Sequence, residues 1–460
     1  MYYPLRFFPS AIFFALVVYG GLFNRSTHAQ ALSPAVSEAF NSLLACERSD
    51  GGWMYACDRS ARVAGFTTVM KRAERLAGIL GFATWDLIVL RSPGTPASGL
   101  LLVRTYQRTH EEKYLAAARR AGDLLVNMQL SSGGWFSEMP AYGNRLAWWF
   151  RWIAPGTTLD DDVTSGSARF LVALWEVTGE TRYKDAANRA FDLLLKAQLS
   201  SGAWPLTWRP AWRRFLRTSF EDWPSLNDAA TTGPIQACLV GARSLNRPEL
   251  LQAAKRGGAW LLQVRNAAPN AGWAQQYDEE GRPAPGRRFE PSGLATWESR
   301  HALEALQALA EATGDKSFCA PFPETIDWLK RSALSPGCWA RFYSADTNAP
   351  VYMDQQGRFV ASAEQAKRPY NWTGDFGIPA LFAQLGLDPT GIPVNTSAAA
   401  HLATWHLPGD AGRCRNAATE EREENAPPSS SPRTRIKRAA TLFGLHEPSS
   451  APVCAATITK

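Results

Sequence analysis

A segment of 22 residues occurs twice in this chain, and its spacing limits the folds that the chain can adopt. Residues 114–135 (YLAAARRAGDLLVNMQLSSGGW) align with residues 183–204 (YKDAANRAFDLLLKAQLSSGAW) at an offset of 69, and 14 of the 22 positions are identical. The Trp that ends each copy belongs to a longer series: Trp53, Trp135, Trp204, Trp273 and Trp339. A recurring period of this length predicts stacked structural repeats.

Each unit carries two helical patterns. In the second pattern of the first copy, Ala, Leu and Met recur at intervals of three and four residues over positions 117–128, which indicates one apolar helix face. An upstream pattern, SGLLLVRTYQRTHEEKY, is matched one period later by SGSARFLVALWEVTGETRY. The turns Thr-Gly-Glu at 178–180 and Thr-Gly-Asp at 313–315 separate paired helices, because Gly suits the left-handed position after a helix end.

A single helix pair cannot bury both of its faces, whereas stacked pairs can. Four or five pairs of this length more often close into a ring than extend as a solenoid. We therefore predict an all-α fold, an α/α toroid (an incomplete α/α barrel) built from helix hairpins, with irregular loops and few short strands. The Gly-Gly-Trp loops then lie on one rim, where each Trp either packs the end of a hairpin or stacks on a sugar.

The two ends of the sequence differ from the repeats. Residues 1–31 combine an early Arg, an apolar run and a final Ala-Gln-Ala, which predicts a secretory signal peptide, with a membrane anchor as the alternative. We expect a secreted or periplasmic protein whose toroid spans residues 32–407. Residues 408–460 are polar, charged and rich in Pro and Ser, and are predicted to be a disordered tail. After export, Cys46 with Cys57 and Cys319 with Cys338 could form disulfides, whereas Cys238 reads as an unpaired buried thiol.

Charge and motifs exclude several functions. The net charge of +7 suits an acidic polymer as partner, although solubility explains it equally well. No Lys/Arg cluster is combined with a nucleic-acid-binding motif, so we expect no nucleic acid partner, and no lasting membrane association after signal cleavage. His110 and His301 show no metal-ligand spacing, and no phosphate-binding Gly-rich loop occurs, so zinc, His-dependent triads and nucleotides are not expected.

Acidic residues recur just before two predicted helices. The segment TTLDDDVTSGS contains Asp160, Asp161 and Asp162, and PSLNDAATTG contains Asn227 and Asp228 about one period later. Such residues often cap helices, but three consecutive Asp exceed what a cap needs. Equivalent positions of a closed array are neighbours, so these side chains are candidates for a Ca²⁺ site, since Ca²⁺ binds six to eight oxygen atoms.

Arginine residues mark the later units. The insert GWAQQYDEEGRPAPGRRFEPSG brings Arg287 and Arg288 next to Glu290, where they either bind a ligand carboxylate or form a surface salt bridge. Arg341 follows the Trp of the fourth unit. A later loop, KRPYNWTGDFG, contains Arg368 and Tyr370.

Several of these segments, taken in order, resemble one family, the family-10 pectate lyases (pectic acid lyases). The similarity extends from about residue 100 to residue 377. The resembling segments are TLDDDVT at 158–164, SGAWP at 201–205, SLNDAA at 225–230, WAQQYD at 273–278, GRRFEPS at 286–292 and WARFYSADTNAP at 339–350. The resemblance implies an exported α-helical toroid that cleaves polygalacturonate by β-elimination with calcium. We expect the protein to be a monomer.

By position, the resemblance makes Asp160 and Asp228 calcium ligands, Arg287 the catalytic base and Arg341 a ligand of a uronate carboxylate. We add Asp161 to the metal site. The remaining candidate substrate-binding residues are Asn227, Arg288, Arg368 and Tyr370.

The chain also departs from the family pattern. Asp161 replaces an Asn, and Ala229 replaces a second Asp. Gln355, in QQG, stands where the family has an Arg expected to contact substrate, and Arg358 is near but out of register. The segment PYNWTG also replaces the usual Gly-Tyr-x-Trp-Tyr-Gly. These changes predict weakened or altered uronate recognition.

Three other functions compete with a lyase as explanations of these motifs. The Gln-x3-Gly-x-Trp repeat also occurs in triterpene cyclases, but their Asp-x-Asp-Asp acid does not fit LDDDV. An α/α glycoside hydrolase acting on uronides would use Asp160 and Asp228 as its acid–base pair. A non-catalytic protein that binds acidic glycans would account for Gln355.

Overall fold

The computed structural model describes residues 32, 34–48, 51–53, 87–92, 94–140, 156–210, 220–366 and 371–387. The predicted signal peptide (1–31) and tail (408–460) therefore lie outside the described residues. Within the described ranges, helices follow one another mostly as antiparallel pairs. The paired helices are α4 (Thr95–Thr109) with α5 (Glu112–Met128), α7 (Val163–Thr178) with α8 (Thr181–Ala197), α10 (Thr232–Ser244) with α11 (Pro248–Val264), and α12 (Thr296–Thr313) with α13 (Phe322–Arg331).

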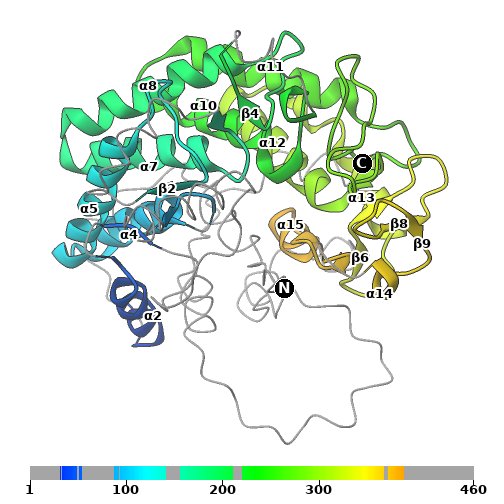
Figure 1. Ribbon diagram of the computed structural model, residues 1–460, viewed down its shortest axis with the longest axis horizontal. Coiled ribbons are helices and arrows are strands. Elements are labelled where there is room, and N and C mark those ends of the chain that lie inside the picture. Colours follow the sequence, from blue (N-terminus) through cyan, green and yellow to red (C-terminus); the bar gives the residue numbers. More distant parts are fainter. Residues whose placement is uncertain are drawn as a thin grey trace, which may run out of the picture.

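The first helix of each pair forms an inner layer. Helix α4 packs on α7, α7 on α10 and α10 on α12, while each second helix packs outside its own partner. In Figure 1 the pairs follow an arch from α4 and α5 over α10 and α11 to α13. The short helices outside the pairs are α2 (Pro34–Ala45), α14 (Ala363–Ala366), α15 (Ile378–Gln384) and the 3-10 turns η1 (Phe220–Asp222), η2 (Asn227–Ala229) and η3 (Lys316–Cys319). This arrangement confirms the all-α, α/α-toroid fold class.

Small residues let the helices approach closely, as the Ala-rich pattern predicts. Ala117, Ala118 and Ala121 of α5 are fully buried. Helices α7 and α12 end at Gly179 and Gly314, both in the left-handed conformation with φ of 71° and 72°. The Thr-Gly turns therefore end the helices as the sequence predicts.

The repeated Trp residues are structural. Each is buried, at 3% exposure or less, so these five side chains pack hairpin ends and do not stack on sugars. Each indole N–H donates to a carbonyl near the end of the preceding α-helix, which is α2 for Trp53 and the second helix of a pair for the other four. The pairs are Trp53–Leu43 (3.0 Å), Trp135–Leu125 (2.9 Å), Trp204–Leu194 (2.8 Å), Trp273–Leu261 (2.8 Å) and Trp339–Leu329 (2.7 Å).

The Gln and Gly of the repeat join one unit to the next. The amide of Gln129 donates to the carbonyl of Gly133 (2.6 Å) and to that of Ala186 in α8, the outer helix of the following unit (2.8 Å). Gln198 repeats both bonds, one period later. Gly133 has a φ of 100°, and a Cβ there would lie 2.3 Å from the carbonyl oxygen of Arg189. Only Gly lets the loop lie this close to the neighbouring helix.

Short antiparallel strands connect the loops at the ends of the inner helices. They are β1 (Leu87–Val89) with β2 (Glu138–Pro140), β3 (Thr157–Thr158) with β4 (Thr207–Trp208), β6 (Trp339–Ala340) with β10 (Thr373–Gly374), and the sheet β5 (Leu294–Ala295), β7 (Phe342–Tyr343), β8 (Pro350–Met353) and β9 (Phe359–Val360). In the register, Thr157 lies opposite Trp208 and Leu294 opposite Tyr343. These strands hold the turns that carry the predicted acids.

Three further features bear on the predictions. Cys46, Cys319 and Cys338 are disulfide-bonded, and Cys238 is free and buried. In the part of the chain that the structure describes, no helix has both the length and the hydropathy needed to cross a bilayer.

Candidate active site

Turns from three successive units lie side by side where the chain enters the inner helices. The backbone N–H of Asp161 donates to the carbonyl of Asp228 at 2.6 Å. The carbonyl of Asp161 in turn accepts from the N–H of Ser92 at 2.9 Å. The sequence period therefore places equivalent turns in direct contact, as expected for neighbouring repeats.

The two acid-bearing turns have an unusual backbone. Asp161, Asp162, Asp228 and Ala229 all have positive φ, between 46° and 65°. For residues with a side chain this conformation costs about 1–2 kcal/mol each. The Asp162 side chain makes no capping hydrogen bond to α7, so the ordinary explanation of these acids as helix caps does not apply there. Such strain concentrates at functional sites.

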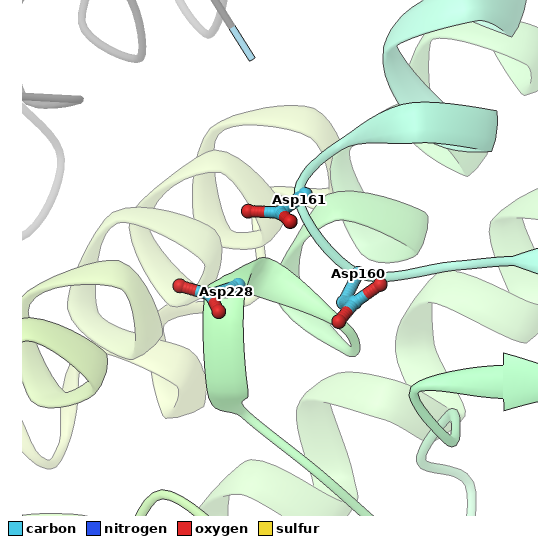
Figure 2. A group of neighbouring side chains, drawn as sticks. All are labelled: Asp160, Asp161 and Asp228. Carbon is cyan, nitrogen blue, oxygen red and sulfur yellow. The ribbon is translucent and has the colours of Figure 1, made fainter. Parts of the chain in front are cut away.

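Three carboxylates converge on these turns. One oxygen from each of Asp160, Asp161 and Asp228 lies within 4.8 Å of the other two, and all three residues are half-buried. Figure 2 shows them together on the two adjacent turns. Burial raises the pKa of Asp160 well above its ordinary value, and the like charges of Asp161 and Asp228 add to this effect, opposed by Arg91 and Arg287.

This cluster fits a divalent cation. Carboxylates this close repel one another, and an ion between them would remove the repulsion. All the donors are oxygen atoms, which Ca²⁺ prefers. Asn227 adds a further donor, because its buried Oδ1 has no protein partner while its Nδ2 donates to Asp228 at 2.9 Å.

Arg287 lies beside this cluster. Its Nη2 is 3.9 Å from Asp228 Oδ2, and its side chain is 46% exposed. Its Nε donates to Glu290 Oε1 at 2.7 Å, and its backbone N–H donates to Glu290 Oε2 at 2.5 Å. The salt bridge to Glu290 is therefore present, and Glu290 itself is buried, at 3% exposure.

Arg341 occupies a second, more buried position. Its Nη2 is 3.3 Å from Glu298 Oε1, and the Glu298 side chain is fully buried. Burial raises the pKa of Glu298 to about 7, with the charges of Asp228 and Glu290 adding to the rise and Arg341 opposing it. Glu298 therefore links Arg341 electrostatically to the carboxylate cluster. Sequence reasoning missed Glu298, which reads as an ordinary surface acid of the helix TWESRHAL.

The other predicted residues are placed less tightly. Arg288 is exposed and lies against the turn at Gly357, where a Cβ would be 2.8 Å from Arg288 Cγ. Within the described residues, no ion pair joins Arg288 to an acidic side chain. Arg358 is 76% exposed and forms a salt bridge with Asp354. Arg368 and Tyr370 lie outside the described residues.

Known proteins provide an independent comparison. The sequence model described as pectic acid lyase matches residues 95–148 and 153–335, which is more than half of the chain. A family 10 polysaccharide lyase from Cellvibrio cellulosa is 20% identical over 61% of this chain and 93% of its own, with a TM-score of 0.47. A mutant of a lyase of that family and organism, in complex with trigalacturonic acid, is 18% identical with the same coverage and a TM-score of 0.48.

An enzyme of another activity also matches in structure. Cellobiose 2-epimerase from Spirochaeta thermophila DSM 6192 is 14% identical over 57% of this chain and 64% of its own, with a TM-score of 0.44. No curated protein matches the sequence. The match to the family's sequence model extends across the acid-bearing turns, Arg287 and the inner helices, and the chain therefore belongs to the pectic acid lyase family.

Proposed function

We propose that this family member cleaves polygalacturonate, or a closely related uronate polymer, by calcium-assisted β-elimination. The observation that carries the proposal is the convergence of Asp160, Asp161 and Asp228 within 4.8 Å, with Arg287 3.9 Å from Asp228. A cation and a guanidinium side by side suit a substrate that carries a carboxylate on every sugar.

The three Asp carboxylates would hold the calcium ion, and Asn227 Oδ1 is positioned on the same turn as Asp228. When bound, the ion would offset the negative charge that develops on the uronate carboxylate as the C5 proton leaves. Arg341 would bind a uronate carboxylate, held in place by Glu298. Arg288, Arg368 and Tyr370 are the proposed contacts to the rest of the polymer.

The elimination balances without added water. The C5–H bond breaks, its proton passes to Arg287, its electron pair forms the C4–C5 double bond, and the C4–O bond breaks. The departing oxygen takes a proton from solvent. A guanidinium is almost always protonated, so Arg287 can act as the base only in the small neutral fraction, which grows with pH. We therefore expect an alkaline optimum.

One assay tests the proposal. Purified protein is incubated with polygalacturonate in CaCl₂ or in EDTA, and the ultraviolet absorbance of the unsaturated product is followed. Absorbance that rises only with calcium supports the lyase. Chain shortening without absorbance indicates hydrolysis, for which the raised pKa of Asp160 next to Asp228 would supply an acid–base pair. Binding without shortening indicates a non-catalytic glycan-binding protein.

We further propose that the enzyme is exported and works as a monomer, with one toroid over residues 32–407. The basic charge of +7 and the acidic polymer suit this location. Sequencing the N-terminus of secreted protein tests cleavage after residue 31, and light scattering tests the monomer.

A further inference from the structure

The third Asp of the Asp160–Asp162 run does not face the other two acids. Asp162 has a left-handed backbone, with φ of 57° and ψ of 24°, and is only 5% exposed. Its Oδ2 accepts a hydrogen bond and ion pair from Arg169 Nη2, and its Oδ1 has no protein partner. Asp160 and Asp161 of this turn therefore belong to the carboxylate cluster, whereas Asp162 is buried and pairs with Arg169.

The Asp162 carboxylate lies between the first turns of α7 and α10. A Cβ on Gly166 of α7 would be 2.7 Å from Asp162 Oδ2, and a Cβ on Gly233 of α10 would be 3.4 Å from Oδ1. The carboxylate therefore contacts the beginnings of both helices. The turns that enter these helices carry Asp160 and Asp161 on one side and Asp228 on the other.

Arg169 extends this contact into a bridge between two units. It belongs to α7, is 2% exposed, and donates from Nη1 to Gln236 Oε1 of α10 at 3.1 Å. A buried network of polar side chains therefore joins the acid-bearing turn of one repeat to the inner helix of the next. Its members are Asp162, Arg169 and Gln236.

We propose that Asp162, Arg169 and Gln236 are positioning residues that set the spacing of the three cluster carboxylates. This inference rests on the cation site of the proposed function. Three like charges from two repeats repel one another, so a defined spacing before the ion binds needs an external restraint. Groups that hold metal ligands in place typically affect metal affinity about 10- to 100-fold.

The test measures calcium affinity by isothermal titration calorimetry of the whole protein with CaCl₂. The decisive variant is Arg169→Gln. Electrostatics alone predicts tighter calcium binding when a positive charge is removed near the site, whereas loss of positioning predicts binding weakened about 10-fold or more. Gln236→Met breaks the link to α10 without a change in charge, and should weaken calcium binding in the same direction.

Arg169→Gln leaves a buried carboxylate without its partner and can unfold the protein. The double variant Asp162→Asn/Arg169→Gln restores neutrality, so it should recover thermal stability while calcium binding stays weak. Glu304→Gln, which breaks the buried Arg300–Glu304 pair of α12 (2.7 Å), is the matched control and should leave affinity unchanged.

The outcomes separate the two proposals. Wild-type protein that does not bind calcium overturns the cation site of the proposed function. Wild-type protein that binds calcium, with Arg169→Gln and Gln236→Met binding as tightly or more tightly, overturns the positioning role alone.

Discussion

Replacing Glu298 with Gln should change how the stability of the protein depends on pH. Glu298 is fully buried, and its pKa of about 7 lies above the ordinary 4.5 because of burial and the charges of Asp228 and Glu290. A raised carboxyl pKa means that the folded protein favours the protonated form. Its contribution to stability is therefore complete below pH 4.5 and is lost as pH rises through 7.

The size of this change in the free energy of unfolding follows from the ordinary and the raised pKa of Glu298. The gap between 4.5 and about 7, at about 1.36 kcal/mol per pH unit, corresponds to about 3 kcal/mol. Gln is neutral at every pH and therefore makes no such pH-dependent contribution to the free energy of unfolding. The free energy of unfolding of the wild type should therefore fall by about 3 kcal/mol relative to Glu298→Gln between pH 4.5 and pH 8.

Urea unfolding of both proteins across this range, in EDTA, measures the difference. EDTA keeps cations away from Asp228, whose charge is one of the causes of the shift. Glu324→Gln is the control for replacing an acid with an amide, because Glu324 is 50% exposed in a surface pair with Arg265 and such pairs contribute little to stability. A difference between wild type and Glu298→Gln that stays flat from pH 4.5 to pH 8 would refute the raised pKa of Glu298.

Three other predictions concern the site and the interfaces between units. Arg287→Ala should abolish turnover of polygalacturonate while binding persists. The control is Arg282→Ala, whose turnover should stay near that of the wild type, because Arg282 is 72% exposed and pairs with Asp278. Near-normal turnover by Arg287→Ala would exclude Arg287 as the base. Activity should be highest at alkaline pH and disappear in EDTA, and full activity in EDTA at neutral pH would contradict the calcium mechanism. Gly202→Ala should lower the melting temperature more than Gly179→Ala. Both residues have positive φ, but only a Cβ at residue 202 would meet a backbone oxygen, Arg256 O, at 2.5 Å. Equal losses of melting temperature would show that backbone strain at positive φ accounts for both effects.

Most of the fold could be predicted from the sequence repeat. A Trp at a near-constant interval, an Ala-rich helix face and Gly after a helix are local patterns, and each fixes a local structure. Gly179 and Gly314 end their helices as predicted. The near-period spacing of Asp160 and Asp228 likewise predicted neighbours, because repeats stack in register.

What the sequence did not predict depends on contacts between units. Glu298 is buried because α12 belongs to the inner layer, and the residue types around it do not reveal which layer a helix joins. Asp160 and Asp162 are the same residue type two positions apart. Only the left-handed backbone at Asp161 and Asp162 decides that one joins the cluster and the other is buried against Arg169.

The site and the fold therefore share the same interfaces. In stacked repeats each unit contacts only its neighbours, so a site divided between two units has the geometry of the interface between them. Here that interface is tied on its outer side by Gln198, which donates to Ala253 of α11, and on its inner side by the Asp161–Asp228 backbone bond and by Arg169. A carboxylate cluster assembled this way gains rigidity from contacts that also stabilise the fold. Substitutions in these contacts should then alter cation affinity even where they touch no cluster carboxylate.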